Sequence, residues 1–196
     1  PGQVDDFEDG TVMNWEEGFI SPNPPFNVPG GGPGGAGDAY LENFSDGGSL
    51  AGGRMVMFNN AQWTGNYNSL GFPPAIQAHM VNLSMNEILL MRVAFEGANG
   101  ARYASTNWTL IDPDGIWYEV TFEITEATMT LVEGSGSLAS TLDDVVEMRI
   151  LSSFSPSWRG DRILATLGVD NIRFAAAVFV DGFESGDTSA WSNTVP

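Results

Sequence analysis

Short runs of alternating apolar and polar residues, separated by glycine and proline, limit the possible folds of this chain more than any other feature. The clearest run is WYEVTFEIT at residues 117–125, in which aromatic or β-branched residues alternate with Glu and Thr. Strict alternation is typical of a β-strand with one buried face. The 24 Gly and 11 Pro residues break the rest of the 196-residue chain into similarly short runs. The sequence therefore predicts an all-β sandwich rather than a helical fold.

The remaining runs place the other expected strands and the limits of the domain. A stretch rich in proline and glycine at residues 21–37 is expected to be a surface loop. One turn of helix is expected at residues 141–144, capped by Thr141. We expect one domain at residues 1–174 and a C-terminal tail at residues 175–196. Strands are expected within residues 2–20 and at 38–44, 54–58, 75–83, 87–95, 145–152 and 163–174.

The charge balance restricts the possible partners. The chain has 25 acidic residues against 7 basic ones, a formal net charge of -18. Such a charge repels nucleic acid and anionic membranes, and no apolar run approaches the ~20 residues that span a bilayer. It also favours bound divalent cations, and calcium, which takes oxygen ligands, is the best candidate. A chain without lysine, cysteine or an initiating Met, rich in Gly, Asn, Ser and Thr, is expected to be a processed extracellular protein.

A motif that occurs near both ends links the start of the domain to the tail. Its pattern, D-x-F-E-x-G-x-x-x-x-W, runs from Asp5 to Trp15 and again from Asp181 to Trp191. Five fixed positions in eleven residues would rarely match by chance, because the chain has only 6 tryptophans. We therefore expect the two copies to be chemical equivalents that fit the same kind of position, either in the same molecule or in a neighbour.

A carboxylate near the end of the domain lies on an expected buried face. In GVDNIRF at residues 168–174, parity places Asp170 on the same face as Ile172 and Phe174. A buried carboxylate costs several kcal/mol unless it is paired or coordinates a metal. Asp170 is therefore a candidate metal ligand.

The two ends of the domain resemble a known group of proteins. F-E-x-G-x-x-x-x-W near the start and G-V-D-N-I-R-F near the end resemble the first and last strands of secreted bacterial β-jelly-roll modules related to calcium-binding carbohydrate-binding and laminin-type domains. The resemblance covers residues 4–174 and implies a jelly-roll β-sandwich of two antiparallel sheets, with a structural calcium between neighbouring first and last strands. It implies calcium ligands from Glu8 or Asp6, from Asp170 and from Asp38. The tail GFESGDTSAWS resembles a recurring C-terminal stretch of secreted bacterial proteins.

A loop with the sequence QWTGNY is the best candidate ligand surface, because it combines aromatic rings with amide groups, as sugar-binding surfaces do. Its candidate binding residues are Trp63, Asn66 and Tyr67. The alternative, which we favour because buried aromatic residues dominate core energetics, is that Trp63 and Tyr67 cap the core. Trp108 and Trp158 are further candidates for stacking on a sugar.

The sequence singles out no catalytic site. No serine or cysteine nucleophile motif accompanies the single histidine, His79. Glycoside hydrolysis needs two carboxylates on either side of a cleft, and no spacing among the acidic residues marks such a pair. We therefore expect a non-catalytic protein.

The tail carries an uncharged run, AAAVFV at residues 175–180, which would be prone to aggregate if exposed. An extra edge strand on the same molecule is one possibility. We favour donation to a neighbour, in which alternate side chains of the added strand fill pockets.

The leading hypothesis is an extracellular structural protein that polymerises head-to-tail with other copies of itself into filaments. The alternative is a carbohydrate-binding module for a polysaccharide. The residues expected to mediate assembly are Val178, Phe179, Val180, Phe183 and Trp191.

Overall fold

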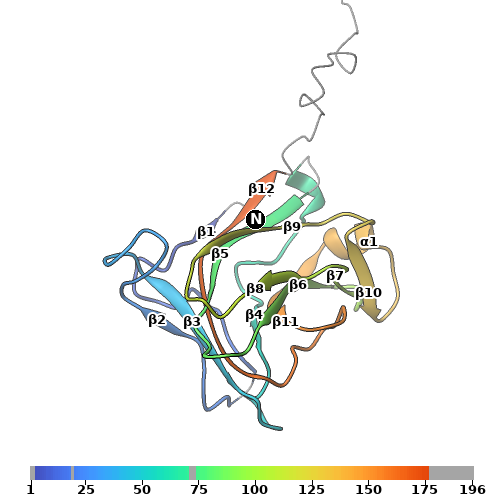
Figure 1. Cartoon of the computed structure of the whole chain (residues 1–196). Helices are drawn as coiled ribbons and strands as arrows, with labels where there is room; N and C mark the ends of the chain where they lie inside the picture. The colour runs from blue at the N-terminus through green and yellow to red at the C-terminus, as the bar shows by residue number, and fades with distance from the viewer. Residues whose placement is uncertain (1–2, 19, 71–73, 177–196) are drawn as a thin grey trace, which may run out of the picture.

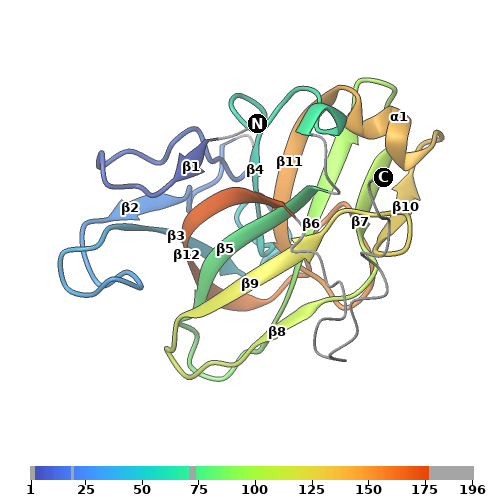
Figure 2. The ribbon, with the colours of Figure 1, turned by 90° about the horizontal axis from the view of Figure 1, so that it is seen from above.

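A computed structural model describes residues 3–18, 20–70 and 74–176 and contains two antiparallel β-sheets packed face to face (Figure 1, Figure 2). The predicted all-β jelly-roll sandwich is confirmed. The first sheet, sheet A, has the strand order β2-β3-β12-β5-β9, with β1 paired to β12. The second, sheet B, has the order β10-β7-β6-β11-β4, with β8 paired to β6.

The strands are short, and most neighbours within a sheet are distant in the sequence. Sheet A consists of β1 (Val4–Asp5), β2 (Phe26–Val28), β3 (Tyr40–Asp46), β5 (Pro74–Asn82), β9 (Tyr118–Glu123) and β12 (Leu164–Ala176). Sheet B consists of β4 (Val56–Asn59), β6 (Leu89–Gly97), β7 (Arg102–Ser105), β8 (Thr109–Ile111), β10 (Met129–Glu133) and β11 (Val145–Ser152). The connections include a short helix, α1 (Leu138–Leu142), and a 3₁₀ turn, η1 (Asn68–Leu70).

The core lies between the sheets and follows the alternation seen in the sequence. In β9, Val120 and Phe122 are buried, whereas the Glu and Thr residues on either side of them are exposed. Aromatic rings pack together within the core: the ring centroid of Phe174 lies 4.6 Å from that of Tyr67 and 5.0 Å from that of Trp63. Aromatic packing therefore ties the end of β12 to the loop that precedes η1.

Several short elements differ from the prediction. Within residues 2–20 only β1 is a named strand, and β2 forms inside the expected loop at residues 21–37 because it pairs with β3. The strands β7, β8 and β10 were not expected, since runs of three to five residues carry little periodicity. The helix starts earlier than predicted: Ser137 is its N-cap and accepts from the backbone N–H of Ser140, while Thr141 lies inside the helix.

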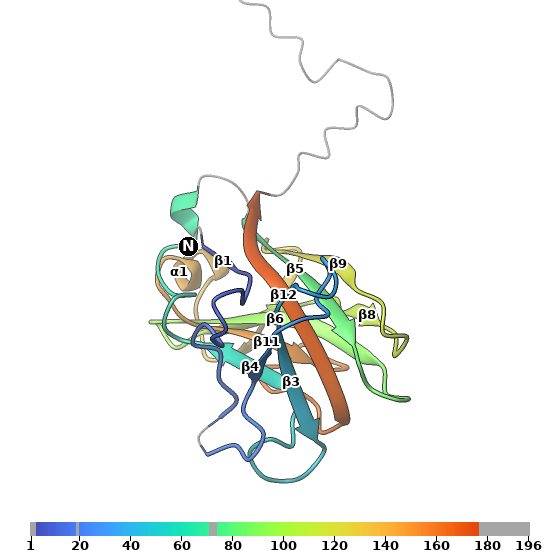
Figure 3. The ribbon, with the colours of Figure 1, turned by 90° about the vertical axis from the view of Figure 1, so that its left-hand side faces the viewer.

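The strand β12 is central to sheet A and runs along its length (Figure 3). It continues to Ala176, past the expected end of the domain at residue 174. The first two residues of the run at 175–180 therefore pair with β5 in the same molecule. The strand β12 therefore includes the first two residues of the stretch that was expected to form the tail.

A bulge in β12 corrects the expected orientation of Asp170. The core residue Val169 pairs with Met80, and Asp170 pairs with His79 on the opposite face of β5. The register then shifts before Arg173. The prediction that Asp170 faces the core is wrong, because the bulge adds a residue and changes the alternation. Asp170 is nevertheless only 1% exposed.

Candidate functional site

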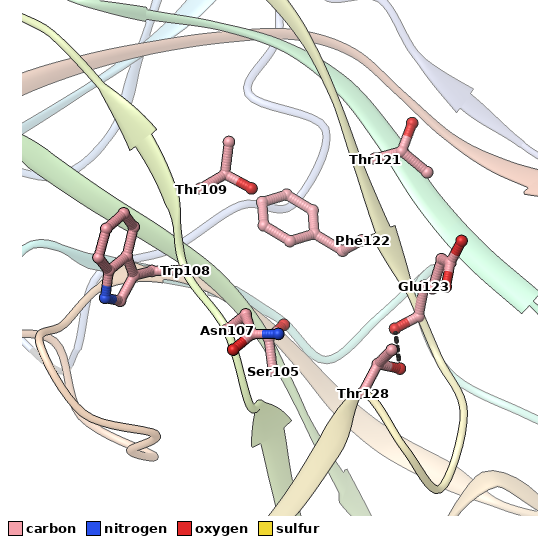
Figure 4. A pocket seen from close by; sticks show the side chains of 8 residues that line it. All are labelled: Ser105, Asn107, Trp108, Thr109, Thr121, Phe122, Glu123 and Thr128. Atoms are coloured by element: carbon pink, nitrogen blue, oxygen red, sulfur yellow. Dashed lines mark hydrogen bonds between the residues drawn. The ribbon is translucent and has the colours of Figure 1, made fainter.

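An exposed tryptophan borders a hollow between the two sheets. Trp108 lies in the connection between β7 and β8 and is 44% exposed. The hollow beside it has a volume of about 230 Å³ and extends from this connection to β9 (Figure 4). Its lining combines two aromatic rings with small polar groups. The lining residues are Ser105, Asn107, Trp108, Thr109, Thr121, Phe122, Glu123 and Thr128.

A second hollow, of about 440 Å³, adjoins the first. It is bordered by Phe154, which is 74% exposed. Asn107 and Trp108 line both hollows, and we call the two hollows together the Trp108 groove. The second hollow is lined by Arg92, Thr106, Asn107, Trp108, Phe154, Ser155 and Pro156.

A buried arginine fixes the two loops that carry the exposed rings. Arg92, on β6, is 1% exposed, and within the described residues its guanidinium donates to four backbone carbonyl oxygens, at the end of β7 and in the two loops. Burial lowers its pKa, and the charge of Asp161 opposes that shift. Because one rigid group bridges both loops, Arg92 sets the position of Trp108 relative to Phe154. The acceptors are the carbonyls of Ser105 at 2.6 Å and of Thr106, Ser153 and Phe154 at 2.9 Å each.

Polar groups in the first hollow are available to a ligand. The Thr128 hydroxyl donates to the carbonyl oxygen of Glu123 at 2.7 Å, which fixes the turn between β9 and β10 (Figure 4). Within the described part of the chain, no hydrogen bond occupies the Glu123 carboxylate or the Asn107 side-chain amide. The groove thus presents the amide of Asn107 beside an aromatic face, whereas the Glu123 side chain leaves β9 on the side away from Trp108 (Figure 4); an amide beside a ring is suited to a ligand rich in hydroxyl groups.

The aromatic loop that contains Trp63 and Tyr67 is part of the core, which is the alternative that the sequence favoured over a ligand surface. Trp63 and Tyr67 are both 0% exposed, so neither ring can stack on a ligand in this structure. The Tyr67 hydroxyl donates to the carbonyl oxygen of Trp63 at 2.9 Å. Asn66 is exposed, but its side-chain oxygen accepts from the backbone N–H of Ser69 at 2.9 Å. These three residues do not form one binding surface.

The buried carboxylate of Asp5 anchors this part of the core. Its Oδ2 accepts from the indole Nε1 of Trp63 at 2.7 Å and of Trp15 at 2.8 Å, and its Oδ1 accepts from the amide of Gln62 at 2.7 Å. Burial raises the pKa of Asp5, and the three donors oppose that shift. The first and last residues of the repeated motif are therefore bonded to each other.

Of the predicted metal ligands, Asp6, Glu8 and Asp38 lie around Asp170. Burial raises the pKa of Asp170 to about 7, its bond from the backbone N–H of Asn171 opposes the shift, and the charges of Asp38, Asp6 and Glu8 add to it. The fold thus brings carboxylates from three separate segments of the chain near one another. They repel one another in the absence of a cation.

In this structure the four carboxylates do not converge on one point. Glu8 accepts from the backbone N–H of Ala39 at 2.8 Å, and Asp38 accepts from that of Gly34 at 2.6 Å. Among the described residues no group of three or more acidic or histidine side chains is close enough to hold a metal ion. Their oxygen chemistry fits calcium, but their placement would have to tighten around the ion.

The predicted assembly residues Val178, Phe179, Val180, Phe183 and Trp191 lie outside the described residues. The sequence analysis identified Trp108 only as a secondary candidate and missed Asn107 and Phe154. The available signal was an aromatic residue among turn-forming polar ones, as in STNWT and SSFSPS.

Comparison with known proteins places this fold among polysaccharide-related structures. No protein family and no curated protein matches the chain. The structure of an exo-β-agarase is similar with a TM-score of 0.60 and 12% identity over 89% of this chain. The family 11 carbohydrate-binding module of a cellulosomal cellulase of Clostridium thermocellum has a TM-score of 0.54 and 15% identity over 90% of this chain. A family 28 module specific for non-crystalline cellulose has a TM-score of 0.52 and 14% identity over 88%.

The lengths of these proteins differ. The chain spans 24% of the agarase but 95% of the family 11 module and 92% of the family 28 module. At this level of identity the likenesses show the fold, a β-sandwich shared with carbohydrate-binding modules. Among the described residues, no helix is long and apolar enough to cross a membrane.

Proposed function

We propose that this chain is a non-catalytic carbohydrate-binding module that binds a polysaccharide in the Trp108 groove. The observation that carries the proposal is the exposed indole of Trp108 with a hollow on each side and polar groups beside it. The likeness of fold supports it, since a family 11 module of similar structure (TM-score 0.55, 16% identity) was solved in complex with a β-1,3-1,4-mixed-linked tetrasaccharide.

The groove offers the two kinds of contact that sugars need. The C–H face of a pyranose ring can stack on the flat rings of Trp108 and Phe154, which removes apolar surface from water. The amide of Asn107 can both donate hydrogen bonds to sugar hydroxyls and accept hydrogen bonds from them. The loops are held in place by Arg92 before a ligand arrives, so little ordering entropy is lost on binding.

The position of Trp108 between two hollows favours binding of the interior of a sugar chain. A ring that closed one end of a pocket would select chain ends, whereas a ring between two adjoining hollows lets the polymer continue past it. We therefore expect binding to grow stronger from a disaccharide to a tetrasaccharide and then to level off.

Trp108→Ala should weaken binding to the recognised polysaccharide roughly 10- to 50-fold, because loss of one stacked aromatic face removes about 1.5–2.5 kcal/mol. The measurement is affinity gel electrophoresis against mixed-linkage β-glucan, amorphous cellulose, xylan and agarose, followed by calorimetry with the best oligosaccharide. Phe26→Ala is a matched control, because Phe26 is 48% exposed and lies on β2, away from the groove. Equal binding by wild type and Trp108→Ala, or no binding to any polysaccharide of this panel, would contradict the proposal.

Arg92→Lys tests whether the guanidinium positions the two rings. A lysine keeps the charge but cannot make four bonds to two loops in one plane. We expect roughly tenfold weaker binding together with a lower melting temperature, because buried carbonyl oxygens lose donors. Crystal or NMR data should show that the two loops move apart. Unchanged affinity would mean that the loops hold their positions without Arg92.

We also propose that calcium binds at the cluster of Asp6, Glu8, Asp38 and Asp170 in a structural role. The support is the repulsion among these carboxylates and the burial of Asp170 without an ion pair in the described part of the chain. A calcium-dependent polysaccharide-binding module would act outside the cell, where both the ion and the polymer are found.

A further inference from the structure

The structure explains each fixed position of the motif that occurs twice in the sequence. In the first copy, Asp5 bonds Trp15, Phe7 and Trp15 are buried in the core, and Glu8 bonds the backbone at residue 39. Gly10 has φ 76°, a conformation that favours glycine. The motif is therefore a compact plug whose two ends are joined by one hydrogen bond.

The plug fits a socket formed by the rest of the domain. Two residues of the socket, Trp63 and Gln62, donate hydrogen bonds to the carboxylate of Asp5. The side-chain amide of Asn27 donates to the carbonyl oxygen of Phe7 at 2.7 Å. The strand β1 of the plug pairs with β12 (Figure 3), with Asp5 opposite Ile172. The five fixed residue types of the plug, Asp, Phe, Glu, Gly and Trp, recur at the same spacing from Asp181 to Trp191. We propose that residues 181–191 are a second plug for this socket, and that they bind to the socket of a second copy of this chain.

Geometry argues against insertion of the second plug into its own molecule. In the first copy Asp5 pairs with Ile172, so the equivalent pairing would join Asp181 to Ile172 of the same chain. The chain would then have to turn within residues 176 and 177, both alanine. Two-residue hairpin loops need positive φ, which alanine disfavours. Ala176 would also have to leave its pairing with Pro74. A second molecule imposes neither requirement.

The second plug lacks one of the acidic residues that lie near Asp170. Asp6, which lies near Asp170, corresponds to Gly182 in the second copy. Exchange of the first plug for the second therefore keeps the five shared residue types and removes one of the charges around Asp170. This favours the exchange in metal-free solution. A contact between a tail and a distant socket is heterologous, so repeated exchange produces closed rings where the rotation between molecules closes and open chains of molecules where it does not.

The full-length variant Trp15→Phe tests the exchange. It weakens the first plug by removing the donor to Asp5 and leaves the socket donors Trp63 and Gln62 unchanged. In metal-free buffer we expect the association constant, measured by sedimentation velocity, to rise roughly tenfold above that of wild type. A second change, Trp191→Phe, should reverse this increase. Asp187→Asn is the matched control, because this tail position is not shared with the first copy.

Cysteine pairs in an otherwise wild-type chain provide an independent measurement. The protein has no cysteine, so Arg173→Cys with Val180→Cys introduces a single pair at positions equivalent to the observed partners Arg173 and Val4. Mixed ¹⁴N and ¹⁵N chains should form disulfides between molecules, whereas the control pair Arg173→Cys with Thr188→Cys should not. Disulfides only within one molecule, or none, would overturn the proposal. So would a Trp15→Phe association that persists with Trp191→Phe.

Discussion

Replacement of Trp63 by alanine should lower the free energy of unfolding by about 3–5 kcal/mol, the range expected for a large buried aromatic side chain. Trp63 is 0% exposed, its centroid lies 6.5 Å from that of Trp15, and its Nε1 donates to Asp5. The substitution leaves a cavity and removes one of three donors from a buried carboxylate. The measurement is urea unfolding followed by circular dichroism.

Two comparisons identify the cause of that loss. Trp63→Phe keeps most of the ring volume but removes the donor, so it should cost about 1–3 kcal/mol. Trp108→Ala, at an exposed ring, should change stability by less than about 0.5 kcal/mol. If Trp63→Ala unfolded at the same urea concentration as wild type, the assignment of this ring to the core would be wrong.

Addition of calcium should raise the melting temperature by roughly 6–10 °C at a concentration 100 times the dissociation constant, which corresponds to about 2.7 kcal/mol in a domain of this size. The reason is the group of carboxylates around Asp170, whose repulsion the ion would remove. Asp170→Asn should abolish most of the effect. A melting curve that is the same with calcium and with chelator would exclude a structural calcium.

The pH dependence provides a second test of this cluster. Because the folded pKa of Asp170 is about 7, above its ordinary value of 3.8, the metal-free protein should lose stability as pH rises from about 4 to about 7, with the full contribution of this group present only below that interval. Calcium needs ionised carboxylates, so its stabilising effect should increase over the same interval. Glu17, buried and with a pKa also raised to about 7 by burial, contributes in the same direction. Asp170→Asn should remove the calcium-sensitive part, and Glu17→Gln should leave that part in place.

The exposed groove was harder to predict than the core. Alternation over residues 117–125 predicts a half-buried strand from local sequence alone, because each side chain's face follows from its position in the strand. Trp63 and Trp108 cannot be told apart in this way. Both lie among polar residues in connections, and only the packing of distant strands decides that the first is buried and the second exposed.

The orientation of Asp170 is likewise not predictable from local sequence. Its candidacy as a ligand came from the sequence, and the fold brings Asp6, Glu8 and Asp38 near it. The bulge that turns it away from the core left no sign in the parity pattern, because a bulge depends on the partner strand.

The sequence by itself determined the all-β class, most of the long strands, the excess of negative charge and the repeated motif. These properties are local or additive, since they depend on alternation, composition and spacing. The tertiary structure alone decided which tryptophan is exposed, that Arg92 joins the two loops of the groove, and what each motif residue contacts. Such contacts join segments far apart in the sequence, such as Asp5 with Trp63 and Arg92 with Ser153. No local pattern encodes them, because the free energy of each contact depends on the packing of the whole sandwich.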